Sequence, residues 1–174
     1  EVGAQLLAQC APTIKKTSME LGGNAPFIVF DDADLDAAVA GAVASKYRNA
    51  GQTCVCTNRF LVRDGVYDAF AAKLKAAVAK LKVGNGLDEG ATIGPLINPD
   101  AVEKVREHIA DAVEHGASVL LGGKPDALGG NFFTPTILTD VPRTAKIFRE
   151  ETFGPVAPLI RFNHEADAVE LAND

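Results

Sequence analysis

The chain has 174 residues, enough for one domain with a substantial hydrophobic core. Its composition, 47% hydrophobic and 23% charged, is that of an ordinary soluble globular protein. The net charge of −6 without a basic block argues against nucleic acid or an anionic membrane surface as a partner, and no apolar run approaches the length of a membrane span.

The first third of the chain predicts helices and strands in alternation. Apolar residues at helical spacing predict a helix that ends before Pro12. Residues 13–21 are expected to form a short strand, and the apolar run at 26–30 is typical of a buried one. Asp34 is placed to cap a helix over residues 35–47.

The rest of the chain continues this alternation. Apolar residues three or four apart mark the helices, and short apolar runs between Gly- and Pro-rich loops mark the strands. We expect strands at 58–63, 118–121, 132–139 and 156–162, and helices at 66–82, 99–115 and 166–173. This order predicts an α/β fold with a largely parallel sheet flanked by helices.

The cysteine count bears on the compartment. The chain has three cysteines, and an odd number with two nearly adjacent does not make a disulfide framework. A reducing compartment, the cytoplasm, is therefore expected. The chain begins without Met or a signal-peptide pattern and stops inside a predicted helix, so we expect a piece of a longer protein.

Cys54 follows a glycine-containing stretch, Gly-Gln-Thr at 51–53, between a predicted helix and a predicted strand. A cysteine attacks only as its thiolate, and free N–H groups in such a turn could stabilise a thiolate or an oxyanion. Free cysteines are also among the most buried residues, so a small core residue is the alternative.

Cys56 lies two positions after Cys54. Alternate Cα atoms of an extended chain are roughly 6.6 Å apart, close to the disulfide limit of about 6.8 Å. A disulfide between the two would be strained and easily reduced, which suits a redox switch better than a structural staple. Two unlinked thiols are the equally weighted alternative.

A thiol nucleophile needs a base, and the histidines do not supply an obvious one. His108 and His115 lie seven residues apart on one predicted helix and make no metal site, and neither has the loop context of a catalytic base. We expect these two and His164 to be surface residues.

Carboxylates offer the alternative. Glu20 precedes a Gly-Gly turn and could reach into a cleft as a general base, or be a solvated turn residue. Glu151 precedes an aromatic residue, Phe153, and a Gly-Pro turn. An acid beside an aromatic ring could hold a ribose and pack a flat ring, or the pair of acids at 150–151 could simply lie on the surface.

Three motifs occur together in order: Glu-Leu-Gly-Gly-Asn at 20–24, Gly-Gln-Thr-Cys at 51–54 and Glu-Thr-Phe-Gly-Pro at 151–155. Over essentially the whole chain, this pattern closely resembles the catalytic domain of the aldehyde dehydrogenase superfamily. Residues 47–59, 87–97 and 129–133 further resemble the branch of that family that oxidises succinate semialdehyde.

The resemblance implies a role for each motif. Cys54 would attack the aldehyde, and the hydride would pass to NADP or NAD, with NADP slightly favoured. Glu20 would activate the water that hydrolyses the thioester. Glu151 would hold the nicotinamide ribose, and Phe153 would pack near the ring.

The resemblance also implies a substrate and an organisation. Arg48 would pair with the distal carboxylate of a small aldehyde, since arginine binds carboxylates bidentately. Cys56 would be the redox partner of Cys54. Residues 1–21 would be the tail of a cofactor-binding domain with an interdomain strand, and 22–174 an incomplete catalytic domain. The full-length parent would be a homo-oligomer, and this piece alone would not run the full redox reaction.

The sequence leaves two other functions open. A thiol esterase or hydrolase would use Cys54 without a cofactor, although it lacks a histidine base. A non-enzymatic redox sensor would use Cys54 and Cys56 alone, and would leave the motifs around Glu20 and Glu151 without a purpose.

Overall fold

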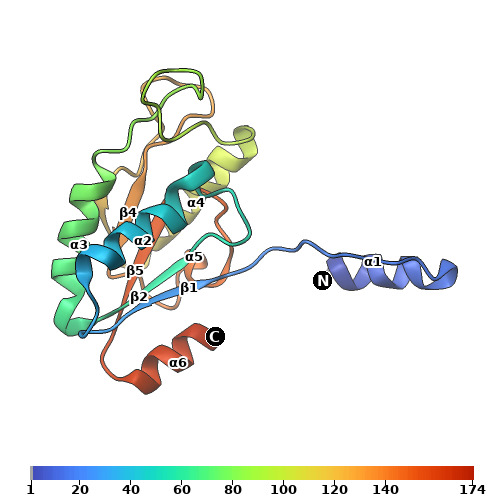
Figure 1. The fold of residues 1–174 in the computed structure, drawn as a ribbon, viewed down its shortest axis with the longest axis horizontal. Coiled ribbons are helices and arrows are strands. Elements are labelled where there is room, and N and C mark those ends of the chain that lie inside the picture. The colour runs from blue at the N-terminus through green and yellow to red at the C-terminus, as the bar shows by residue number, and fades with distance from the viewer. Residues whose placement is uncertain (1) are drawn as a thin grey trace.

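The computed structural model describes residues 2–174 and contains a five-stranded sheet with the order β1-β2-β5-β4-β3 (Figure 1). The strands are β1 Pro26–Val29, β2 Arg59–Arg63, β3 Ser118–Leu121, β4 Thr136–Thr139 and β5 Val156–Phe162. All neighbouring strands are parallel except β3, which pairs antiparallel with β4. The prediction of an α/β fold with a largely parallel sheet is confirmed.

Helices alternate with these strands. They are α1 Val2–Cys10, α2 Leu35–Tyr47, α3 Asp64–Val78, α4 Pro99–Glu114, α5 Lys146–Arg149 and α6 Glu165–Asn173, with short 3-10 turns η1 Ala11–Thr13 and η2 Arg48–Gly51. The predicted cap of α2 is confirmed, because the Asp34 carboxylate accepts hydrogen bonds from the backbone N–H groups of Asp36 and Ala37.

The sequence-based prediction fails in three places. The predicted strand at 13–21 is absent: after η1 this exposed segment pairs with no neighbouring strand. The strand predicted over 132–139 is confined to β4, because residues 132–135 contact the preceding loop through an isolated bridge between Pro125 and Phe133. Helix α5 was not predicted, since four residues are too few to show helical periodicity.

Two buried tyrosines fix helices to the sheet. The Tyr47 hydroxyl at the end of α2 donates to the Thr136 carbonyl oxygen at 2.8 Å. The Tyr67 hydroxyl on α3 donates to the Leu159 carbonyl oxygen at 3.1 Å. Each bond satisfies a hydroxyl that would be costly to bury alone. The end of α2, which leads into the loop of Cys54, is therefore anchored to β4.

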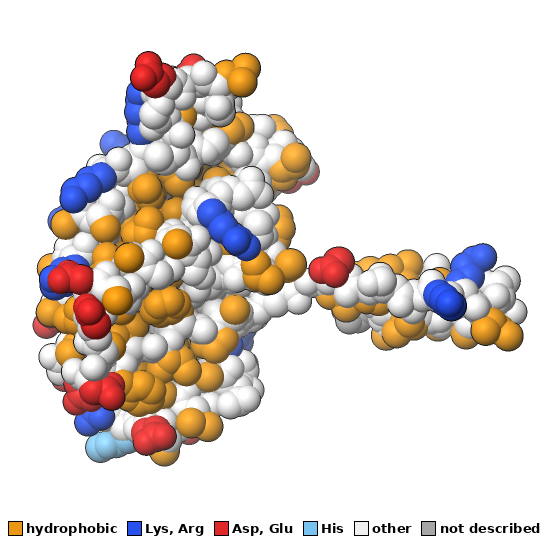
Figure 2. All heavy atoms as spheres, in the orientation of Figure 1, with side chains coloured by type: hydrophobic (Ala, Val, Ile, Leu, Met, Phe, Trp, Pro, Cys, Tyr) orange, Lys and Arg blue, Asp and Glu red, His pale blue; other side chains and the backbone are white. Residues whose placement is uncertain are grey.

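Helix α1 stands apart from the rest of the molecule, joined to β1 by an extended segment (Figure 1). Hydrophobic side chains are visible along it in Figure 2, and Leu6, Leu7 and Ile14 are exposed. Cys10, at the end of this helix, is half-buried. Across residues 2–174, no helix combines the length and the apolar character needed to cross a membrane.

Candidate active site

Four of the residues singled out from the sequence line one pocket of about 410 Å³: Glu20, Cys54, Glu151 and Phe153. The rest of the pocket wall is formed by their neighbours Leu21, Gly22, Gln52 and Thr53. The three motifs are far apart in the sequence, so it is the fold that brings a thiol, two carboxylates and an aromatic ring together.

The segment carrying Glu20 has no regular structure and is held by side chains from the start of β2. The Asn58 amide donates to the Gly23 carbonyl oxygen at 2.9 Å. The buried Arg59 guanidinium donates to the Asn24 carbonyl oxygen through Nη2 at 2.8 Å. Asn24 in turn donates from Nδ2 to the Phe148 carbonyl oxygen at 3.0 Å. These bonds fix the segment beside the Cys54 loop without strand pairing.

The loop of Cys54 has an unusual backbone. Asn49, Ala50 and Gly51 all have left-handed conformations, with φ of 50°, 53° and 76°. Such a run is costly for Asn and Ala, and non-glycine residues of this kind cluster at functional sites. The Gln52 side chain fixes the far end of the run by accepting from the Ile97 N–H at 2.9 Å.

Residues 53–56 form a turn rather than an extended strand, because the Cys56 N–H donates to the Thr53 carbonyl oxygen at 3.0 Å. The extended geometry assumed for the two cysteines is therefore wrong. Cys54 is exposed, whereas Cys56 is 1% exposed, with its Sγ 2.6 Å from the Thr53 hydroxyl oxygen. Both thiols are free.

Glu151 and Phe153 offer a free hydrogen-bond acceptor and a partly exposed aromatic ring. Oε1 of Glu151 is buried and has no hydrogen-bond partner within residues 2–174, so it is ready to accept from a ligand hydroxyl. Oε2 would lie 2.5 Å from a Cβ at Gly22, so only glycine leaves this approach open. Phe153 is 38% exposed, with φ of 54°. A ribose beside the acid and a flat ring beside the phenyl group suit these features.

Lys46 is a charged residue of this region that the sequence analysis missed. It is fully buried in the last turn of α2, and its Nζ has no hydrogen-bond partner in the described part of the chain. Burial lowers the pKa of Lys46 to about 8, an effect that the neighbouring Cys56 and Glu151 partly oppose. The helical spacing of Lys46 from the buried Val39 and Ala42 was the sequence signal that indicated its burial.

Arg48 is not brought into this group. It begins η2, its side chain is exposed, and it does not line the pocket of Cys54. Its pairing with a substrate carboxylate stays a prediction.

The prediction that the histidines lie on the surface is wrong for one of them. His115 and His164 are exposed, but His108 is buried on α4 at 2% exposure. The inward face of α4 explains the difference, because His108 lies between the buried Val105 and Ile109 at helical spacing.

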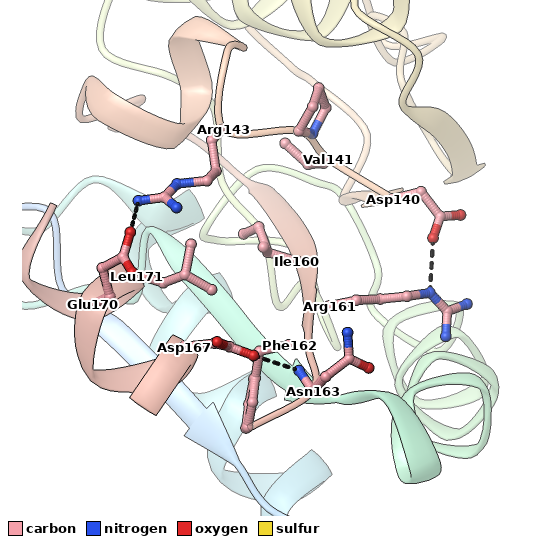
Figure 3. Close-up of a pocket in the computed structure, with 11 residues that line it drawn as sticks. Asp140, Val141, Arg143, Ile160, Arg161, Phe162, Asn163, Asp167, Glu170 and Leu171 are labelled. Atoms are coloured by element: carbon pink, nitrogen blue, oxygen red, sulfur yellow. Dashed lines mark hydrogen bonds and ion pairs between the residues drawn. The ribbon is translucent and has the colours of Figure 1, made fainter. Parts of the chain in front are cut away.

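A second pocket, of about 450 Å³, lies by α6 and the end of β5, and Figure 3 shows the residues that line it. Its arginines are already paired: Arg143 Nη2 lies 2.9 Å from a Glu170 oxygen, and Arg161 Nε lies 3.0 Å from an Asp140 oxygen. It contains no cysteine. The smaller pocket therefore holds the candidate chemistry.

The chain is similar in sequence to known proteins. The whole chain, residues 1–174, matches the model of the aldehyde dehydrogenase family. It is 68% identical over 174 residues to a glutarate-semialdehyde dehydrogenase of Pseudomonas aeruginosa, matching 100% of this chain and 36% of that protein. The same identity and coverage relate it to the NADP(+) succinate-semialdehyde dehydrogenase GabD of Escherichia coli: 68%, 100% and 36%.

The fold is shared as closely as the sequence. A crystal structure of an NADP-dependent enzyme of E. coli superimposes with a TM-score of 0.97 at 68% identity, covering 99% of this chain and 36% of that one. A succinate-semialdehyde dehydrogenase of Burkholderia pseudomallei gives a TM-score of 0.97 at 67% identity, with 99% and 36% coverage. The chain thus spans about a third of the length of the relatives it matches.

Proposed function

The chain belongs to the aldehyde dehydrogenase family, and we propose that the full-length protein oxidises a small aldehyde with a distal carboxylate, first of all succinate semialdehyde, using NADP⁺ or NAD⁺. The observation that carries this proposal is the single pocket lined by Glu20, Cys54, Glu151 and Phe153. The Cys54 thiol and the Glu20 carboxylate in one pocket suit covalent aldehyde oxidation, because the thiol can attack the aldehyde and the carboxylate can act as a base.

Cys54 is the proposed nucleophile because it is the exposed thiol of the pocket. Its thiolate sulfur bonds to the aldehyde carbon and leaves a hemithioacetal with a negatively charged oxygen. When that carbon loses its hydrogen with the bonding electron pair, a thioester remains on Cys54. Bound NAD(P)⁺ supplies the hydride acceptor.

Glu20 is the proposed base of the second half-reaction. Its carboxylate takes a proton from the water that attacks the thioester carbon, and the carbon–sulfur bond then breaks to release the acid and the Cys54 thiolate. The exposure of Glu20 at the pocket edge supports water access to this position.

Glu151 and Phe153 are proposed to hold the cofactor's nicotinamide end. The unpartnered Oε1 of Glu151 would accept from ribose hydroxyl groups, and the Phe153 ring would pack beside the nicotinamide. The E. coli relative named with NADP(+) favours NADP over NAD. The projecting α1, with apolar side chains exposed, supports placing residues 1–21 with a cofactor-binding domain, although residue 1 lies outside the described residues.

Arg48 is proposed to select the distal carboxylate, although it does not line the pocket itself. Two relatives at equal identity are named succinate- and glutarate-semialdehyde dehydrogenase. Similarity therefore does not decide the carbon-chain length of the substrate. We also propose that the full-length protein is a homo-oligomer in the cytoplasm. Light scattering tests the oligomeric state, and cell fractionation tests the location.

The test follows the absorbance of reduced nicotinamide with the full-length protein under reducing conditions. Succinate semialdehyde, glutarate semialdehyde and uncharged butanal are each supplied with NADP⁺ or NAD⁺. We expect both semialdehydes to be preferred over butanal, and Arg48→Met to lose about 10- to 100-fold of that preference as one charged contact disappears. Arg106→Met, an exposed arginine on α4, is the control. No turnover of either semialdehyde with either cofactor would overturn the proposal.

A further inference from the structure

We propose that the buried His108 on α4 is a positioning residue that acts through Thr152 to hold Glu151 and Phe153 toward the pocket of Cys54. The inference rests on the proposed function, because that function makes the pocket of Cys54 the active site. His108 contacts none of the reactive groups of the pocket and takes no part in the proposed reaction.

The contacts of His108 define its protonation state. Its Nε2 lies 3.4 Å from a carboxylate oxygen of Glu150, so Nε2 carries the hydrogen and points it at the acid. Its Nδ1 lies 3.0 Å from the Thr152 hydroxyl oxygen. Nδ1 is then the acceptor, and the Thr152 hydroxyl donates to it. The imidazole thus bridges residues 150 and 152, on either side of Glu151.

Both side chains of this contact are enclosed. His108 and Thr152 are each 2% exposed. Burial lowers the pKa of His108, and Lys104 acts in the same direction, while Glu150 and Glu107 oppose it. The ring is therefore neutral near pH 7, in agreement with the hydrogen-bond pattern. Without His108 Nδ1 as its acceptor, the buried Thr152 hydroxyl would lose this hydrogen bond, which costs stability.

The same helix holds the segment at two further points. Lys104 Nζ donates to the Glu151 carbonyl oxygen at 2.6 Å. On the far side, a Cβ at Gly154 would overlap Cγ2 of Val105, so the backbone there lies directly on α4. One face of α4 therefore contacts the chain before, at and after Thr152.

Phe153 needs this support because its backbone is strained. Its φ of 54° lies in the left-handed region, which is costly for a residue with a large side chain. Such a conformation persists only where neighbouring contacts determine it. The contacts of Thr152 and Gly154 flank Phe153 directly, so releasing Thr152 lets the segment relax and turns Glu151 and Phe153 away from the pocket.

The test compares matched variants of the full-length protein. His108→Ala and Thr152→Val remove the contact from either side, and His108→Asn and Thr152→Ser retain an acceptor or a hydroxyl. His115→Ala, at an exposed histidine that directly follows the last residue of the same helix, is the control. We expect the first two to raise KM for the cofactor by about 3- to 10-fold with a smaller change in kcat, because one buried hydrogen bond is lost. The conservative variants should restore most of the loss.

The double variant His108→Ala/Thr152→Val should be no worse than either single one, since both remove the same bond. Hydrogen exchange, followed by mass spectrometry, gives a readout that does not depend on activity: exchange should rise in the peptide covering residues 150–154 and stay unchanged in β2 and α3. Unchanged cofactor KM together with unchanged exchange, or a rise spread over the whole core, would overturn the inference. A wild-type protein without dehydrogenase activity would instead refute the proposed function, and the exchange pattern alone would then decide for or against the role of His108.

Discussion

Gly51 and Gly154 pack backbone to backbone: a Cβ added to Gly51 would overlap the carbonyl oxygen of Gly154. One glycine belongs to the motif of Cys54 and the other to the motif of Phe153. A comparable approach joins Gly22 to the Glu151 carboxylate. Glycines of the three motifs are thus the points where the motifs touch, which gives a physical reason for glycine at these positions.

Gly51→Ala should destabilise the protein and abolish activity. The new Cβ would be strained at φ of 76° and would also displace the backbone of Gly154, which has no flexible side chain to move aside. Strain and overlap together should cost about 2 kcal/mol or more. Urea unfolding of the full-length protein measures the loss. The control is Gly65→Ala on α3, where a Cβ meets nothing within 4 Å, and equal effects of both variants would refute the close-approach argument.

Gly22→Ala should act on cofactor binding rather than on stability. Its Cβ would lie 2.5 Å from Oε2 of Glu151, a side-chain atom that can move away. We expect a raised cofactor KM with a nearly unchanged unfolding midpoint. Gly86→Ala, with nothing within 4 Å of its Cβ, is the control. An unchanged KM in Gly22→Ala would mean that the position of Glu151 does not matter for the cofactor.

The sequence alone predicted most strands and helices, because their apolar runs and periodic faces are local patterns. It failed at residues 13–21, which look strand-like but have no neighbour to pair with. It also failed at α5, whose position depends on contacts with α4: the Asp111 carboxylate accepts from the Lys146 N–H at 2.7 Å. Such contacts leave no local pattern to read.

The sequence predicted some residues of the site and not others. Motifs identified Glu20, Cys54 and Glu151, but their meeting in one pocket required the fold. Lys46 escaped notice and His108 was wrongly expected on the surface, because ionisable residues on a helix are usually exposed. Their burial follows from how α2 and α4 lie on the sheet, which periodicity indicates only weakly.

Cys54 and Cys56 should respond differently to a mild oxidant. Cys54 is exposed and Cys56, at the end of the same turn, is buried, so a disulfide requires residues 53–56 to rearrange. We expect hydrogen peroxide to inactivate the full-length protein in a way that a thiol reductant reverses. In Cys56→Ser, which should retain activity when reduced, Cys54 has no partner and oxidises further, so inactivation becomes irreversible. A peptide map without a Cys54–Cys56 disulfide in oxidised wild type would contradict the redox-partner assignment.

Lys46 should make stability depend on alkaline pH. Its pKa falls from 10.5 to about 8 on folding, so between these values the unfolded chain binds more protons and the free energy of unfolding rises with pH. Burying the ammonium group costs about 3 kcal/mol below this range. Lys46→Met should therefore stabilise the full-length protein near pH 7, with the gain shrinking towards pH 10. Urea unfolding across this range checks the sign, and a less stable variant at pH 7 would show that Lys46 has a partner that compensates its charge.

Trapping the thioester tests directly whether Cys54 carries the acyl group. It also tests whether Glu20 activates the water that removes this group. Full-length Glu20→Gln is mixed with succinate semialdehyde and NADP⁺, quenched in acid, digested and analysed by mass spectrometry. We expect one rapid burst of reduced nicotinamide and a succinyl group on the peptide of Cys54, with none in Glu20→Gln/Cys54→Ala. Normal steady turnover in Glu20→Gln, or an acyl group on any residue other than Cys54, would contradict it.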